Sequence, residues 1–243
     1  LPLFLVNARL SERSARRVNQ FGRAGRSLFQ AFAGILAQTQ FDAERYRNLG
    51  VKKVEIVGNL KFDVPLDSSL VQQGKAWQQE LHDKQRLLVC AASTRDGEEA
   101  LILRAWKDLL QSKGFEIQPL LCIVPRHPER FYEVAKQIHD AGLKFQRRSA
   151  WSRVPQSTKD SDVILGDSMG EMPIYYSAAD LVVMGGSLLP FGGQNLIEAC
   201  AAGCPVLLGE HTFNFQQAAL DAIKIGAAKR IEGELIPDEP IAL

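Results

Sequence analysis

The chain has 243 residues, of which 46% are hydrophobic and 23% charged, enough for one large globular domain or two modest ones. Its formal net charge of +1 excludes a strong overall attraction to nucleic acid or membranes, and no run of about 18 apolar residues could span a bilayer. The four cysteines form neither CxxC pairs nor a Cys/His array, so reduced thiols are expected rather than zinc or disulfides, which favours a cytoplasmic setting.

Apolar runs of strand length recur along the chain and alternate with segments of helical period. In chain order the runs are LFLVN, GILAQT, KVEIVG, RLLVCAA, IQPLLCIV, LKFQR, DVILG, DLVVM and PVLLG. Such alternation predicts an α/β fold with parallel sheets that are covered on both faces. Helix starts are expected at Ser11, at Thr94 or Asp96, and at Pro128.

The chain opens inside an apolar run, LPLFLVNARL, that has neither the basic segment nor the cleavage site of a signal peptide. The polar stretch DVPLDSSLVQQGK, which starts at Asp63, is the best candidate for a linker. We therefore expect residues 1–62 to be the end of an incomplete first domain. Residues 63–243 are then a second domain with a truncated C-terminal end.

A basic stripe is predicted near the N-terminus. On an ideal helix of about 100° per residue, five arginines fall within about 120°, while Leu10, Val18, Phe21 and Leu28 occupy another side. The five are Arg9, Arg13, Arg16, Arg17 and Arg23. Such a stripe suits anionic lipid headgroups, although a merely solvated basic face is the alternative and Gly22 and Gly25 weaken the helix.

The segment MGGSLLPFGGQNLIE, residues 184–198, places four glycines between the strand DLVVM and a short helix that ends at Gly203. Glycine permits positive φ and close approach of the backbone to a ligand, and a helix N-terminus offers unpaired N–H groups. With CPVLLG after it, the pattern predicts a βαβ unit that binds a ligand, such as a phosphate, at the C-terminal ends of its strands. A tight turn without a ligand is the alternative.

Two further loops follow predicted strands and carry polar side chains. Pro125 and Arg126 come after IQPLLCIV, and GDSMGEM comes after DVILG, with Asp167 or Ser168 as candidate helix caps. Arg126 suits a phosphate because its planar guanidinium donates two hydrogen bonds at once. A surface arginine and a first-turn acid at Glu171 are the corresponding structural interpretations.

Asn195 and Glu198 have two interpretations. If Asn195 is a helix N-cap, Glu198 falls at the third helical position and the two form a capping pair. Alternatively, Glu198 accepts hydrogen bonds from ribose hydroxyls, as an acid does in other nucleotide sites. Ser93 and Thr94 lie at a strand-to-helix turn, where a capping role is favoured over donation to a sugar or phosphate.

Seven blocks in the same order together resemble the 3-deoxy-D-manno-octulosonic acid (Kdo) transferase family. Besides the glycine-rich segment they are NARLSERSARR, VGNLKFD, AASTRDGEE, VPRHPERF, LGDSMGEM and GEHTFNFQQA, and they span nearly the whole chain. The resemblance implies a GT-B type Rossmann-like domain with a parallel sheet, preceded by the tail of a second Rossmann-like domain.

The resemblance also implies a set of site residues. Lys61, in GNLKFD, matches the lysine that stabilises the transition state. The sequence departs from the commoner family form at Gln194, Leu196 and Ala199, and no role is carried over to Gln194. The family's general base, a glutamate of the first domain, has no match here. The positions that match contacts to the CMP part of the donor are Pro125, Arg126, Met169, Gly170, Glu171, Asn195, Leu196, Ile197 and Glu198.

By the same resemblance, the enzyme transfers Kdo from CMP-Kdo to lipid A precursor, with inversion, at the cytoplasmic face of the bacterial inner membrane. No cofactor, metal or nucleic acid is implied, and the DSD run at Asp160–Asp162, which imitates a metal-binding DxD, is interpreted as a solvated loop. Two alternatives stay open. Another GT-B nucleotide-sugar enzyme, such as an epimerase, would not need the basic stripe, whereas the missing base favours a non-catalytic nucleotide-sugar-binding fragment.

Overall fold

The computed structural model describes residues 1–60, 66–112, 117–152, 158 and 160–231. The chain divides into two compact units, Leu1–Pro65 and Leu66–Leu243. The boundary predicted at Asp63, and Lys61 with it, lie outside the described residues.

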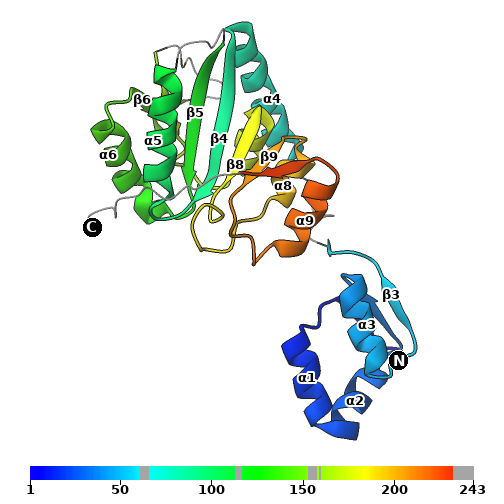
Figure 1. Cartoon of the computed structure of the whole chain (residues 1–243). Helices are drawn as coiled ribbons and strands as arrows, with labels where there is room; N and C mark the ends of the chain where they lie inside the picture. The colour runs from blue at the N-terminus through cyan, green and yellow to red at the C-terminus, as the bar shows by residue number, and fades with distance from the viewer. Residues whose placement is uncertain (61–65, 113–116, 153–157, 159, 232–243) are drawn as a thin grey trace. The chain divides into compact units, whose positions relative to one another are not determined.

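The first unit is a small parallel α/β layer (Figure 1). Its sheet has the order β1-β2-β3, with strands Phe4–Ala8, Gly34–Ala37 and Val54–Ile56. The helices are α1 (Glu12–Gln20), α2 (Gly22–Gln30) and α3 (Gln40–Asn48). Ile35, Tyr46 and Leu49 are buried in its core. Ser11 begins α1 as predicted, because its side chain accepts the N–H of Ser14 at 3.2 Å.

The basic segment differs from the single helix that was predicted. The chain breaks at Phe21, between α1 and α2, and Gly22, the first residue of α2, takes a left-handed φ of +58°. Phe21 and Leu28 are therefore 74% and 64% exposed instead of forming an apolar side. Arg9 precedes α1 and Arg23 belongs to α2, so only Arg13, Arg16 and Arg17 share one helix.

The second unit is built on a seven-stranded sheet in the order β10-β9-β8-β4-β5-β7-β6, and every pair of neighbours is parallel. This confirms the predicted fold class. The nine predicted strands are all present, and the described residues hold one more, β10, which was missed because it is short and polar. In this sheet the strands are β4 (Arg86–Thr94), β5 (Gln118–Pro125), β6 (Phe145–Arg147), β7 (Val163–Leu165), β8 (Leu181–Met184), β9 (Val206–Leu208) and β10 (Ala228–Arg230).

Helices cover both faces of this sheet (Figure 1). Along β4, Leu88 and Cys90 belong to one apolar cluster and Ala91 to the other, as the alternation of side chains in a strand requires. The first cluster includes side chains of α4 (Ser68–Asp83), α7 (Met172–Ala178), α8 (Ile197–Ala201) and α9 (Gln216–Lys224). The second includes α5 (Glu98–Gln111) and α6 (Phe131–Asp140).

Several local predictions were wrong. Most of the supposed linker is the start of α4, because Asp67 caps the N–H groups of Ser69 and Leu70 at 2.8 and 3.2 Å. Neither Thr94 nor Asp96 caps α5, whose N-cap is Gly97 at a φ of +83°. The start predicted at Pro128 holds in part, because Pro128 is the first residue of a 3-10 turn, Pro128–Arg130, that leads directly into α6.

Candidate functional site

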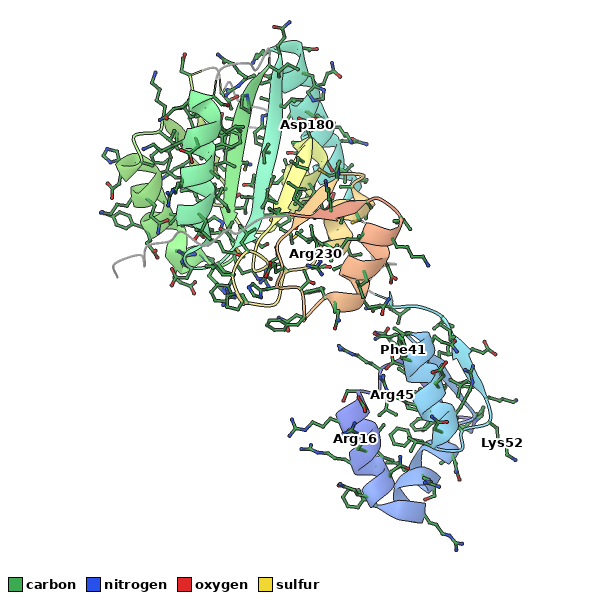
Figure 2. All side chains as sticks on the ribbon, viewed as in Figure 1. Arg16, Phe41, Arg45, Lys52, Asp180 and Arg230 are labelled. Atoms are coloured by element: carbon green, nitrogen blue, oxygen red, sulfur yellow. The ribbon has the colours of Figure 1, made fainter. Side chains whose placement is uncertain are left out.

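The predicted site residues follow three strands, β5, β7 and β8, whose C-terminal ends lie at one edge of the sheet. This edge is common to them because β8, β4, β5 and β7 are consecutive parallel neighbours. Asp180, just before β8, marks the opposite edge, and Arg230, at the end of β10, marks this one (Figure 2). In open α/β sheets, ligands bind outside the carboxyl ends of the strands.

Arg126 lies directly after β5. Its backbone N–H donates to Thr94 O at 3.0 Å, which fixes it beside the end of β4, and its side chain is exposed. Pro125 is buried. Among the described residues, no hydrogen bond or ion pair engages the Arg126 guanidinium. It is therefore available to an anion.

The loop after β7 presents Met169 and Gly170 to solvent. Met169 is 65% exposed, and Gly170 has a φ of +77°, a conformation that favours glycine. The carboxylate of Glu171 is engaged within the protein, because Arg148 Nη2 donates to its Oε1 at 2.6 Å and the Ser168 hydroxyl donates to its other oxygen.

Neither of the two candidate caps, Asp167 and Ser168, is the N-cap of α7. Ser168 bonds Glu171 and Tyr175, and Asp167 accepts from the backbone and hydroxyl of Ser149 at 2.8 and 2.7 Å. Glu171 itself is the N-cap residue of α7, without a capping hydrogen bond from its side chain. The loop after β7 is thus ordered by side chains rather than by a helix cap.

Asn195 and Glu198 combine parts of both interpretations. Asn195 Oδ1 accepts the backbone N–H of Ile197 at 3.2 Å, a local turn rather than a capping box, while Asn195 Nδ2 donates to Glu198 Oε1 at 3.1 Å. The amide thus orients a half-buried carboxylate at the start of α8. Leu196 and Ile197 are 1% and 6% exposed, so their side chains pack in the core rather than face a ligand.

Tyr176, on α7, is buried. Burial raises the pKa of its hydroxyl most, Cys90 and Glu198 raise it further, and the positive charge of Arg126 lowers it.

Glu98, at the start of α5, is a structural centre of the site that sequence reasoning missed. Its fully buried carboxylate accepts four backbone N–H groups, those of Arg95 (2.8 Å), Gly186 (2.7 Å), Leu188 (3.0 Å) and Leu189 (3.3 Å). Burial raises its pKa, and these hydrogen bonds oppose that shift. It fastens the glycine loop, residues 185–193, to the turn after β4. The signal in the sequence was an acid pair directly after Gly97.

Gly185 shows how closely these segments pack. A Cβ there would lie 2.3 Å from Ser93 O, so a side chain would push the ends of β4 and β8 apart. Ser93 itself has a φ of +56°, at an irregularity in the β4-β5 register. The glycine is needed here for close approach of backbone to backbone.

Other candidate features lie elsewhere. Asp162, of the DSD run, accepts the Lys144 N–H at 2.9 Å just before β7, at the edge of the sheet away from the site residues. In the part of the chain that the structure describes, no three His, Cys, Asp or Glu side chains are grouped to hold a metal ion. A cavity of about 570 Å³ lies between α5 and α6, and another of about 390 Å³ lies against α1.

The parallel sheet with polar and glycine-rich loops at its C-terminal edge defines the Rossmann-like class of nucleotide-binding domains. Among solved structures, the C-terminal CMP-Kdo binding domain of WaaA from Acinetobacter baumannii matches with a TM-score of 0.60 and 32% identity, over 68% of this chain and 83% of that one. The sequence model of the 3-deoxy-D-manno-octulosonic-acid transferase (kdotransferase) family matches residues 1–64.

Curated relatives agree. The 3-deoxy-D-manno-octulosonic acid transferase of Bordetella pertussis is 45% identical over 95% of this chain, and that of Haemophilus influenzae is 37% identical over 89%. The chain belongs to the 3-deoxy-D-manno-octulosonic acid transferase family. It spans about half the length of these relatives, 53% and 50%. Within the described ranges, no helix is long and apolar enough to cross a membrane.

Proposed function

We propose that this chain binds CMP-Kdo as a glycosyl donor, and that the protein transfers Kdo to the lipid A precursor in lipopolysaccharide biosynthesis. The observation that carries the proposal is that Arg126, the 169–171 loop and Glu198 follow the parallel strands β5, β7 and β8 at one edge of the sheet. The family membership, and the similarity to the CMP-Kdo binding domain of WaaA from Acinetobacter baumannii, support this choice of ligand.

Each site residue has a role in the proposal. Arg126 donates to the phosphate of CMP, since its guanidinium has no other partner in the described structure. Glu198, held by Asn195, accepts from the ribose hydroxyls. The exposed Met169 and the backbone of Gly170 and Glu171 pack against the nucleotide.

The proposed reaction is a direct displacement. The acceptor hydroxyl attacks the anomeric carbon of Kdo as the bond from that carbon to the phosphate oxygen breaks, so the configuration inverts and CMP departs. A base takes the hydroxyl proton, and by the family resemblance this base is a glutamate that has no match in these residues. Lys61, by the same resemblance, stabilises the charge that develops in the transition state. We propose that neither a metal nor a cofactor is required.

We also propose that the protein acts at the cytoplasmic face of the inner membrane. Arg13 and Arg17 of α1, together with the exposed Phe21 and Leu28, offer cationic and apolar side chains on the first unit (Figure 2 labels the neighbouring Arg16). Such a combination suits anionic lipid headgroups, which include the phosphates of the lipid A precursor.

A transfer assay with the complete protein tests the function. Incubation with CMP-Kdo and a tetraacylated lipid A precursor should add the mass of one or more Kdo units, with or without a chelator. Lys61→Ala should lower kcat far more than it weakens CMP binding. If the complete protein binds CMP but transfers no Kdo, a nucleotide-sugar enzyme of another kind would be favoured.

A further inference from the structure

Arg95 is a second cation at the ligand-binding edge of the sheet, one residue beyond β4. Its guanidinium lies over the ring of Phe191, 4.9 Å from the centroid, and its Nη1 lies 3.0 Å from His127 Nε2. Because an arginine can only donate, this nitrogen of His127 is the acceptor. Contacts with Phe191 of the glycine loop and with His127 of the loop after β5 therefore fix the orientation of the Arg95 side chain.

Arg95 also has a fixed backbone. Its N–H donates to the buried carboxylate of Glu98 at 2.8 Å, and its carbonyl accepts the N–H of Glu98 at 3.0 Å. In the described ranges no acidic side chain forms an ion pair with it, since Asp96 pairs with Arg130 at 3.3 Å and Glu98 serves backbone groups. A half-buried, oriented guanidinium without a counter-ion suits an anionic ligand.

Arg95 and Arg126 leave neighbouring strands side by side. Thr94 is the register partner of Pro125, so the two arginines follow paired positions on strands that are spaced about 4.8 Å apart. The proposed donor carries two anionic groups at a similarly short separation. In a sugar of this class, a 2-keto acid, the carboxylate and the phosphate oxygen are bonded to the same anomeric carbon.

We propose that Arg95 binds the sugar carboxylate of the donor while Arg126 binds its phosphate, which makes Arg95 the residue that selects a sugar acid. The assignment rests on the proposed function. Arg126 takes the phosphate because its exposed guanidinium forms no hydrogen bond or ion pair within the described structure. Arg95 contacts Phe191 of the glycine loop, and we assign it to the sugar carboxylate.

Calorimetry on the full chain, titrated with CMP, CMP-Kdo and the methyl ester of CMP-Kdo, tests the assignment. The wild type should bind the acid at least about 10-fold more tightly than the ester, because a hydrogen bond to a charged group contributes about 1.5 kcal/mol or more. In Arg95→Gln this ratio should fall toward one, with CMP affinity unchanged within about twofold. Arg95→Lys should retain part of the ratio, and Arg104→Gln, an exposed change on α5, should retain all of it.

The possible failures are distinguishable. A wild type that binds none of the three ligands overturns the proposed function and this assignment with it. If the wild type binds them and Arg95→Gln keeps the ratio of acid to ester, only the role of Arg95 is overturned. An equal loss of CMP and CMP-Kdo affinity would assign Arg95 to the phosphate. If Arg95→Gln does not fold, as judged by circular dichroism, the ratio in Arg95→Lys decides, and an unreduced value overturns the assignment.

Discussion

The carboxylate of Glu98 accepts the backbone N–H of Gly186 at 2.7 Å, across 88 positions of the sequence. Because the same side chain also accepts from Leu188 and Leu189, one acid at the start of α5 fixes the path of the glycine loop after β8. A loop that is ordered before the ligand arrives binds it more tightly, because less conformational entropy is lost on binding.

Glu98→Gln is therefore expected to lower the free energy of unfolding by about 1.5–3 kcal/mol, since an amide presents an N–H to one side of a ring of N–H donors. Hydrogen exchange at the amides of Gly186 and Leu188 should accelerate. The matched control is Glu80→Gln, which breaks an exposed ion pair with Lys84 and should cost less than about 1 kcal/mol. Unchanged exchange at both amides would contradict the anchoring role.

Glu198 is expected to accept hydrogen bonds from the ribose hydroxyls. Wild-type chain should bind CMP about 10-fold more tightly than 2′-deoxy-CMP, and Glu198→Gln should bring that ratio close to one, because a charged acceptor for the hydroxyls is lost. Asn195→Ala should reduce the ratio partly, since it frees the carboxylate that Asn195 Nδ2 orients. Equal preference in wild type and Glu198→Gln would return Glu198 to a purely structural role.

Cys204 gives the fold a dependence on alkaline pH. Its thiol donates to Ala179 O at 3.2 Å, and burial, followed by the influence of Cys90, raises its pKa to about 12. In the unfolded chain the thiol releases its proton near pH 8.5, about the ordinary value, while the folded chain keeps it. The unfolded state then binds fewer protons, so stability is lost as the pH rises above that value.

Urea unfolding between pH 8 and 10 measures this loss. The free energy of unfolding should fall with pH, and Cys204→Ala should reduce the slope by up to about 1.4 kcal/mol per pH unit. A slope that is the same in both proteins would show that the Cys204 thiol does not contribute.

The basic face of α1 is expected to bind anionic lipid. Replacement of both Arg13 and Arg17 by Gln should weaken binding to phosphatidylglycerol vesicles about 10- to 30-fold, because each charge near the surface contributes about 1 kcal/mol. Sedimentation of the chain with the vesicles measures this affinity. The double change Lys52→Gln, Lys53→Gln removes the same charge from the same unit and is the control. If both pairs of changes weaken binding equally, net charge rather than this face is responsible.

The architecture was predictable because buried parallel strands read as apolar runs, such as RLLVCAA and IQPLLCIV, and each run holds a strand. The break at Gly22 was harder to place, since a glycine in a helical pattern is tolerated as often as it interrupts. The start of α4 was missed because Asp67 and two serines suit a loop and a helix cap equally well.

The site was predictable only in part. Residues at strand ends, such as Arg126 and Glu198, can be found from the pattern of strands and loops. The roles of Glu98 and Arg95 depend on partners that are distant in sequence, namely the N–H of Gly186 and the ring of Phe191. A periodic pattern carries no information on such contacts, which only the packed fold creates.

The most direct test of the central claim is calorimetric titration of the chain with CMP, UMP and AMP, repeated with Arg126→Gln and with Arg104→Gln as the control. We predict that CMP binds most tightly, that Arg126→Gln weakens CMP binding by about 1.5–3 kcal/mol, and that Arg104→Gln leaves it unchanged. Equal affinity for all three nucleotides, or a CMP affinity that does not respond to Arg126→Gln, would contradict a CMP-sugar donor site at the C-terminal edge of this sheet.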